Sequence, residues 1–237
     1  MDSPIRILDV GWGDVQLTDL YAVLRSVETC FRSAFGQHFN SALVWVVHLD
    51  NVNPCCYRNR NTITLSAKDM LYAKYVYQFA HEYCHYQLPF EPIHELRWLE
   101  ETLCELASLY MLRQVDELWS REPPYEVWRE YHSEFTKYAE IVEREYEYVS
   151  LDFSVEPNAI LSDLRRYEYD REKNMYIALQ LLPLFNEHPE LWHSVPFLCR
   201  ANDRNTFRGA LKKWQQASPA DSWAALSELA AVFSIQL

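Results

Sequence analysis

Glycine is scarce in this sequence, with 4 residues in 237, whereas proteins on average contain about 7%. Such a shortage disfavours glycine-rich phosphate-binding loops, collagen-like repeats and all-β folds with many tight turns. The six cysteines are too few and too irregularly spaced for a disulfide scaffold in a chain of this length. The adjacent pair Cys55-Cys56 is not a CxxC zinc or redox motif. We therefore expect a helix-rich, cytoplasmic protein with reduced thiols.

Positive charge is in short supply as well. The chain has 22 Lys and Arg against 34 Asp and Glu, a net charge of −12, which argues against nucleic acid as a partner. No run approaches the roughly 18 to 20 apolar residues of a membrane span, and the first residues lack the regions of a signal peptide. We expect neither nucleic acid nor a membrane as partner, and the oligomeric state stays open.

Hydrophobic residues make up 49% of the chain, enough for a substantial core. The segments 42–49 and 61–66 have the β-branched and alternating patterns of strands, and residues 17–35 have the apolar spacing of an amphipathic helix. Further helices are predicted over 68–88, 94–115, 125–149, 161–185, 207–214 and 223–233.

These patterns predict an α+β fold that is predominantly helical. A small N-terminal α/β lobe, residues 1–90, would hold a short mixed or antiparallel sheet. A helical C-terminal lobe, residues 91–237, would complete one compact unit.

The most informative residues are His81-Glu82-Tyr83-Cys84-His85, an HExxH motif inside the predicted helix 68–88. Positions i and i+4 lie on one face of a helix, so both imidazoles can bind one Zn²⁺. Glu82 then lies beside the open coordination position and can accept a proton from the metal-bound water. The motif predicts one zinc ion per chain, with His81 and His85 as ligands and Glu82 as the catalytic base.

A catalytic zinc requires a third protein ligand. Glu101 and Glu105 share a face of the next predicted helix, so one can bind zinc while the other orients a ligating histidine. His94, nine positions after His85, is an alternative third ligand.

The motif followed by a helical glutamate resembles the gluzincin metallopeptidases, the clan of thermolysin. Trp98-Leu99-Glu100-Glu101 with Glu105 is similar to their W-L-N-E-G-x-x-E pattern, which implies a zincin-like fold with Glu101 as third ligand and Glu105 supporting it. Counting by thermolysin's spacing would select Glu105 instead. The segment 61–66 resembles the edge strand along which such enzymes align a peptide. Glu100 and Thr102 depart from the pattern, standing where Asn and Gly are usual.

The resemblance implies a zinc-dependent metallopeptidase, a hydrolase acting on a peptide or protein substrate. The alternative is a zincin-fold binding or regulatory protein that retains zinc with little or no peptidase activity. Gluzincins also stabilise the oxyanion with a Tyr or His, for which the candidates are His132, Tyr146, Tyr148, Tyr167, Tyr169 and Tyr176.

Two further groups of residues have competing interpretations. Arg165, Arg166 and Arg171 are either a clamp for a substrate carboxylate or solvated helix charges. Cys84 and Cys104 are expected to be small core residues rather than ligands.

Overall fold

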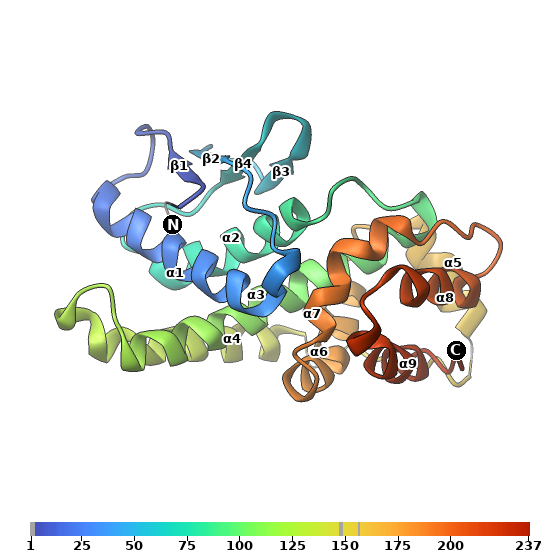
Figure 1. The fold of residues 1–237 in the computed structure, drawn as a ribbon. Helices are drawn as coiled ribbons and strands as arrows, with labels where there is room; N and C mark the ends of the chain where they lie inside the picture. Colours follow the sequence, from blue (N-terminus) through green and yellow to red (C-terminus); the bar gives the residue numbers. More distant parts are fainter. Residues whose placement is uncertain (1–2, 147–148, 156) are drawn as a thin grey trace. The chain divides into compact units, whose positions relative to one another are not determined.

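The computed structural model describes residues 3–146, 149–155 and 157–237. The chain divides into two compact units that are interleaved along the sequence. The first, which we call the sheet unit, comprises residues 1–33, 39–86 and 107–142; the second, the helical unit, comprises 34–38, 87–106 and 143–237. Figure 1 labels the elements along the chain. Helices predominate over one small mixed sheet, which confirms the predicted α+β class.

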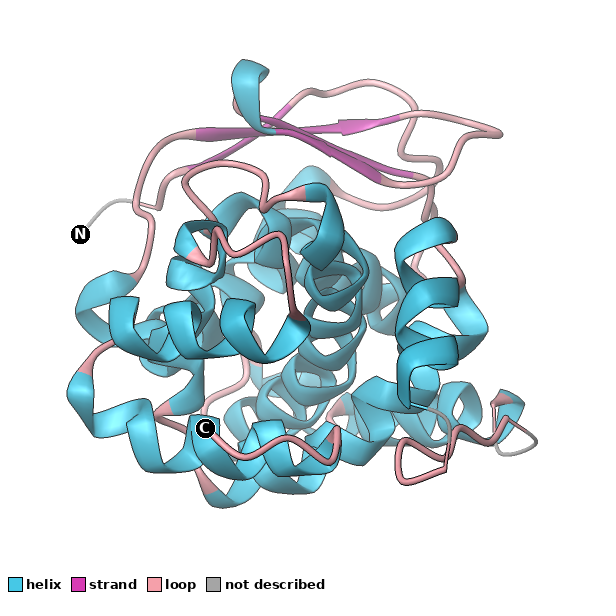
Figure 2. Ribbon diagram, turned by 90° about the vertical axis from the view of Figure 1, so that its right-hand side faces the viewer, coloured by secondary structure: helices cyan, strands magenta, loops and turns pink. Residues whose placement is uncertain are grey.

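The sheet unit contains four strands, β1 (Ile5–Ile7), β2 (Val44–His48), β3 (Cys55–Tyr57) and β4 (Thr62–Leu65). They form one layer (Figure 2) in the order β1-β2-β4-β3. β1 and β4 pair with β2 in parallel, whereas β3 pairs with β4 in antiparallel orientation. The sequence predicted β2 and β4, but β1 and β3 are each three residues long, too short to show an alternating pattern.

One strand assignment is corrected. The segment 61–66 was expected to be the edge strand, yet β4 is paired on both sides, by β2 and by β3. The two edge strands are β1 and β3. The chain turns back between β3 and β4, so the two strands form a hairpin. In this hairpin β3 covers the edge that β4 would otherwise present.

Helix α1 spans Leu17–Phe35, as predicted. It carries Glu28, which is fully buried and is surrounded by donors. The hydroxyl of Ser3 donates to Glu28 at 2.8 Å, the guanidinium of Arg32 donates at 2.7 Å, and Arg25 forms a second ion pair. Burial of this carboxylate is therefore compensated by charge-assisted hydrogen bonds.

Helix α2 spans Tyr72–Gln87 and begins four residues later than predicted. Asp69 has a left-handed backbone, with φ of 58°, which a right-handed helix does not allow. Its carboxylate accepts from the backbone N–H of Asp14 at 2.9 Å, and its own N–H donates to the carbonyl of Trp12 at 2.8 Å. These contacts hold the residues before Tyr72 outside the helix.

Side chains of α2 attach it to the sheet. The amide oxygen of Gln78 accepts from the backbone N–H groups of Ser66 and Ala67, at 3.0 and 2.9 Å. At the other end of the helix, the hydroxyl of Tyr86 donates to the carbonyl of Leu43 at 2.8 Å. The helix is thus fixed to the ends of both central strands.

A 3₁₀ turn at His94–Leu96 leads into α3, Arg97–Arg121, which extends six residues past the predicted end. Its last turns belong to the sheet unit. There the hydroxyl of Ser108 donates to the carbonyl of Tyr77 on α2 at 3.1 Å, and the indole N–H of buried Trp119 donates to Ser26 at 2.8 Å. Burial of Trp119 explains why the helix continues beyond residue 115.

The predicted helix 125–149 is interrupted. A 3₁₀ segment at Glu126–Tyr131 precedes α4, Ser133–Glu145, and residues 147 and 148 lie outside the described residues. The remaining 3₁₀ turns are Gly36–His38, Arg58–Arg60, Val195–Arg200 and Ala220–Ser222.

The helical unit contains α5 (Pro157–Arg166), α6 (Arg171–Glu187), α7 (Leu191–Ser194), α8 (Phe207–Ala217) and α9 (Trp223–Val232). The prediction of one helix over 161–185 is wrong, because the chain leaves the helix after Arg166. Asp170 then caps α6, its carboxylate accepting from the N–H of Lys173 at 3.2 Å. Four residues, 167–170, thus form a loop between α5 and α6. Among the described residues, every helix is too short or too polar to cross a bilayer.

Candidate metal centre

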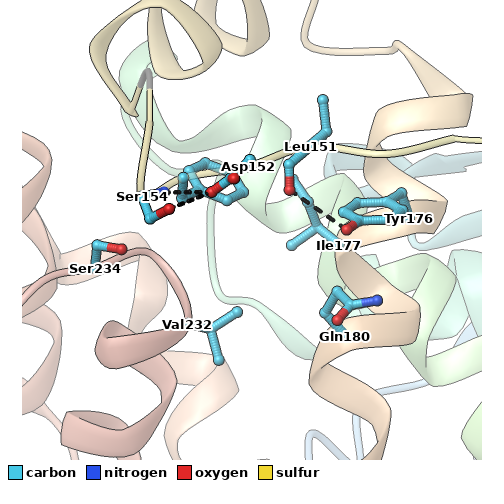
Figure 3. Close-up of a pocket in the computed structure, with 9 residues that line it drawn as sticks. Leu151, Asp152, Ser154, Tyr176, Ile177, Gln180, Val232 and Ser234 are labelled. Carbon is cyan, nitrogen blue, oxygen red and sulfur yellow. Dashed lines mark hydrogen bonds between the residues drawn. The ribbon is translucent and has the colours of Figure 1, made fainter.

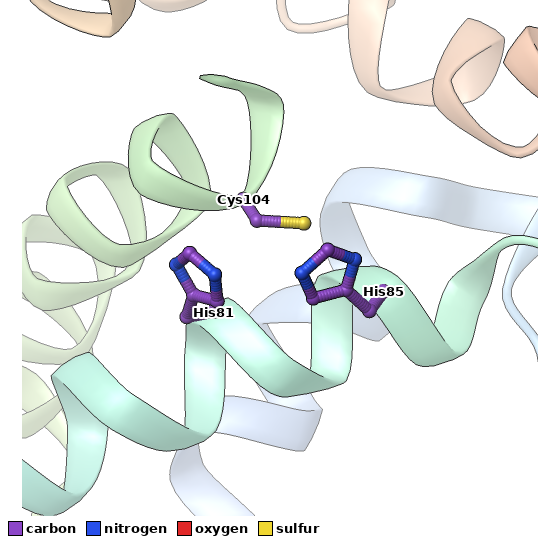
Figure 4. A group of neighbouring side chains, drawn as sticks. All are labelled: His81, His85 and Cys104. Atoms are coloured by element: carbon purple, nitrogen blue, oxygen red, sulfur yellow. The ribbon is translucent and has the colours of Figure 1, made fainter. Parts of the chain in front are cut away.

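The HExxH motif lies on α2, as the sequence predicted, and both histidines occupy one face of the helix (Figure 4). Their ring centroids are 5.1 Å apart, the separation that one helical turn imposes. His85 and Glu82 are buried, with exposed fractions of 9% and 5%, and His81 is half-buried. A metal bound there would therefore lie in a partly desolvated environment.

The residues that follow β3 contact the second histidine. The Nε of Arg58 donates to the carbonyl of His85 at 2.8 Å, and its Nη2 lies 3.4 Å from the Nδ1 of the same residue. The carbonyl contact fixes the backbone of the second histidine near the end of α2.

Cys56 of the edge strand β3 lies within electrostatic reach of the same motif. Burial raises the pKa of the Cys56 thiol to about 12, while the nearby His85 and Arg58 oppose that shift and Glu82 adds to it. Cys55 raises the pKa of Tyr57, and Glu82 makes a smaller contribution in the same direction. The edge strand therefore runs close to the catalytic glutamate predicted from the sequence.

A cysteine stands with the two histidines as a third donor. One ligand atom each from His81, His85 and Cys104 lies within 4.8 Å of the others, and the three side chains point toward one another in Figure 4. Two imidazoles and a thiolate are a donor set that suits zinc. The sequence reasoning placed Cys104 in the core, and it is indeed fully buried, but a buried thiol on this face can also be a ligand.

The glutamates predicted to complete the site lie on α3 within the helical unit. Glu101 is half-buried, and Glu105 is buried with its carboxylate 3.2 Å from the Nε of Arg171. The alternative ligand His94 is paired elsewhere, its Nδ1 lying 2.9 Å from the carboxylate of Glu168. The choice of Glu101 as third ligand stays a prediction, as does the supporting role of Glu105.

The departure at Thr102 has a structural role. Thr102 is fully buried, and its hydroxyl lies 2.9 Å from the carbonyl of Trp98 and 3.3 Å from the side-chain oxygen of Asn174 on α6. The amide of Asn174 in turn donates to the carbonyl of Glu168 at 2.9 Å. Thr102 therefore connects the helix of Glu101 to the α5–α6 loop, a contact that glycine could not make.

That loop lines a pocket of about 580 Å³ in the helical unit, together with His94, Arg97 and Arg166. Of the oxyanion candidates, Tyr167 and Tyr169 line this pocket. The others have separate environments: the hydroxyl of Tyr176 donates to the carbonyl of Leu151 at 3.3 Å, and His132 lies 2.7 Å from Asp116. Burial raises the pKa of Tyr146, which lies near Arg171 and Glu105, and Tyr148 lies outside the described residues.

A second pocket of about 200 Å³ lies between residues 151–154, α6 and the end of α9 (Figure 3). Two of its polar residues are hydrogen-bonded to each other: the carboxylate of Asp152 accepts from the N–H of Ser154 at 2.9 Å and from its hydroxyl at 2.5 Å. This small pocket offers no group comparable to the histidines of α2.

No disulfide joins the six cysteines, all of which lie among the described residues. In comparisons with known proteins, no family model, no curated protein and no solved structure matches this chain.

Proposed function

We propose that this protein is a zinc-dependent metallopeptidase with a zincin-like fold of the gluzincin type. The observation that carries the proposal is the placement of His81, Glu82 and His85. The two imidazoles lie side by side on one face of α2, and a buried carboxylate stands between them in the sequence. One buried and one half-buried imidazole so arranged favour a bound divalent metal over an accidental surface pair.

Zinc bound by these imidazoles would acidify a coordinated water molecule and polarise the peptide carbonyl. Glu82 accepts the proton of the attacking water and then donates it to the leaving amine. Its low exposure keeps bulk water away from that proton transfer. Arg58 donates to the carbonyl of His85 and so helps to fix the end of the helix.

For the third ligand we propose Glu101, because residues 98–105 resemble the gluzincin pattern. Cys104 competes for the same role.

The edge strand β3 supports a peptide as substrate. Its outer backbone groups have no strand partner among the described residues, and an extended peptide can add to such an edge by main-chain hydrogen bonds. Because Cys56 and Tyr57 of this strand lie within electrostatic reach of Glu82, a peptide aligned there would pass close to the catalytic base.

The experiment is elemental analysis of protein purified without chelator, followed by hydrolysis of a fluorogenic peptide library with and without 1,10-phenanthroline. We expect one zinc per chain and cleavage that phenanthroline abolishes. Absence of stoichiometric metal, or cleavage that persists in the Glu82→Gln variant, would refute the mechanism. The Glu28→Gln variant is a matched control, since it removes a buried glutamate charge on another helix of the same unit.

A second candidate function is a zincin-fold binding or regulatory protein. The position of Cys104 favours it, because a thiolate ligand donates more charge to zinc than a carboxylate and makes the metal a weaker Lewis acid. Stoichiometric zinc without any phenanthroline-sensitive cleavage would support this candidate. A Cys104→Ser variant that retains zinc while Glu101→Gln loses it would instead assign the third ligand to Glu101.

A further inference from the structure

The pocket beside the α5–α6 loop lies next to the predicted third ligand. Arg97, which lines the pocket, precedes Glu101 by one turn of α3, so the two side chains share a face. Tyr169 also lines the pocket, and the charge of Glu101 helps to raise the pKa of its hydroxyl, after burial and Glu168. A substrate bound at Glu101 would therefore extend into this pocket.

The carboxylates of the pocket are already paired. Glu168 has Arg97 at 3.4 Å and His94 at 2.9 Å, and its side chain is 12% exposed. Asp170 has Lys173 at 2.6 Å and also caps α6. Each acidic group is held by a basic partner, so neither presents an uncompensated negative charge to a ligand.

Arg166 is different, because its guanidinium forms no ion pair within the part of the chain that the structure describes. It lies over the ring of Tyr167, 5.2 Å from the centroid. Stacking on a tyrosine orients the planar guanidinium while leaving its N–H edge available for a bidentate contact. The pocket therefore offers one oriented cation in a protein whose net charge is −12.

The wall that carries Arg166 and Tyr167 is also well supported. The chain of contacts from Thr102 through Asn174 to the carbonyl of Glu168 fixes the loop to α3. A selective site requires such support, because ordering a mobile arginine side chain on binding costs conformational entropy and weakens the affinity for the ligand.

We propose that this pocket binds a carboxylate of the peptide substrate and that Arg166 recognises it. The inference rests on the proposed function, because it takes Glu101 and the adjoining pocket as parts of one substrate site. The carboxylate has two sources in a peptide, an acidic side chain or the free C-terminus, and both present the same planar group to a guanidinium.

The test measures binding by isothermal titration calorimetry to the full chain carrying Glu82→Gln, so that no peptide is cleaved. Three alanine pentapeptides are compared: a blocked peptide with a central glutamate, the same peptide with glutamine, and the glutamine peptide with a free C-terminus. We expect one of the two carboxylate peptides to bind about 10-fold more tightly than the blocked glutamine peptide, and which of them binds identifies the source.

The Arg166→Gln substitution should abolish that preference. The matched control is Arg208→Gln, which removes the same charge from an exposed position on α8 and should retain it. Equal binding of all three peptides, or a preference that survives Arg166→Gln, would overturn the inference. Because binding requires neither turnover nor metal, a selective pocket in a protein without zinc would refute the proposed function while leaving the carboxylate site standing.

Discussion

Two buried glutamates of the sheet unit, Glu28 on α1 and Glu82 on α2, occupy contrasting environments. Glu28 is enclosed by Arg25, Arg32 and a serine hydroxyl, and arginine keeps its charge at every accessible pH. Glu82 stands between two histidines in the sequence. Burial raises the pKa of the nearby Cys56 and Cys55 raises that of Tyr57, and Glu82 makes a smaller contribution to both shifts. Burial alone does not identify a catalytic carboxylate; the chemistry of its neighbours does.

The largest expected effect is a loss of activity that distinguishes Glu82 from Glu28. Glu82→Gln should lower kcat/KM by about 10³-fold, since removing a general base costs a factor in that range, while the zinc content stays at one per chain. Steady-state kinetics and elemental analysis on the same preparation measure both quantities. A variant with full activity would place Glu82 with Glu28 as a structural residue.

Metal removal should affect stability through α2. If zinc binds the folded chain alone, a free concentration 100-fold above Kd adds about 2.7 kcal/mol to the free energy of unfolding. Chelation by 1,10-phenanthroline should lower the midpoint of urea unfolding in the wild type but not in His85→Ala. An equal response of both proteins to the chelator would exclude His85 as a ligand.

Glu28→Gln should lower the stability of the fold and leave the activity unchanged. Removing this charge leaves two arginines with a weaker acceptor in a buried position, and we expect unfolding to become about 2 kcal/mol easier. Urea denaturation measures the loss. Activity per folded molecule and zinc content should be unchanged, and a loss of zinc would show that the two regions are not independent.

Alkaline pH should weaken the α1 region through Cys30, two residues from Glu28. Burial, with a smaller contribution from Glu117, raises the pKa of the Cys30 thiol to about 12. As the pH rises above 9, the unfolded chain loses this proton while the folded chain keeps it, so stability falls toward pH 12, by at most about 1.4 kcal/mol per pH unit. Urea unfolding at pH 9 to 11 should be less pH-dependent in Cys30→Ala, and identical slopes would contradict the assignment.

The smallest effect should come from an outer partner of Glu28. Arg32→Gln removes a side chain that is 35% exposed, so solvent screens much of the interaction and we expect a loss of about 0.5 kcal/mol. Comparison with Glu28→Gln by urea denaturation gives the difference between losing the buried charge and losing one of its partners. A loss as large as that of Glu28→Gln would mean that Arg32 alone compensates the buried charge.

Local patterns predicted much of the fold, and long-range contacts account for most of what they missed. Helix α1 followed from its apolar spacing alone. The start of α2 did not, because Asp69 is held outside the helix by Asp14, 55 residues away in the chain. The break after Arg166 was missed although residues 170–174 are all polar, and the capping Asp170 was the available signal.

In the candidate site, too, local patterns predicted one part and missed another. HExxH is a local motif, so its residues and helix could be predicted from spacing. The third donor depends on how α3 is rotated about its own axis, and Glu101, Cys104 and Glu105 lie within about a turn of one another, so spacing alone cannot rank them. Arg166 belonged to a group of arginines whose roles the sequence left open, and only the paired states of Glu168 and Asp170 set it apart.

The shortness of β3 bears on how the protein avoids aggregation. An open strand edge is a template for pairing with other copies of the chain, and proteins limit that risk with short edges and flanking charges or prolines. β3 has three residues, with Pro54 before it and Arg58 and Arg60 after it. Such an edge can receive a brief stretch of extended chain but cannot support a growing ladder, so an edge open to peptides need not make the protein self-associate.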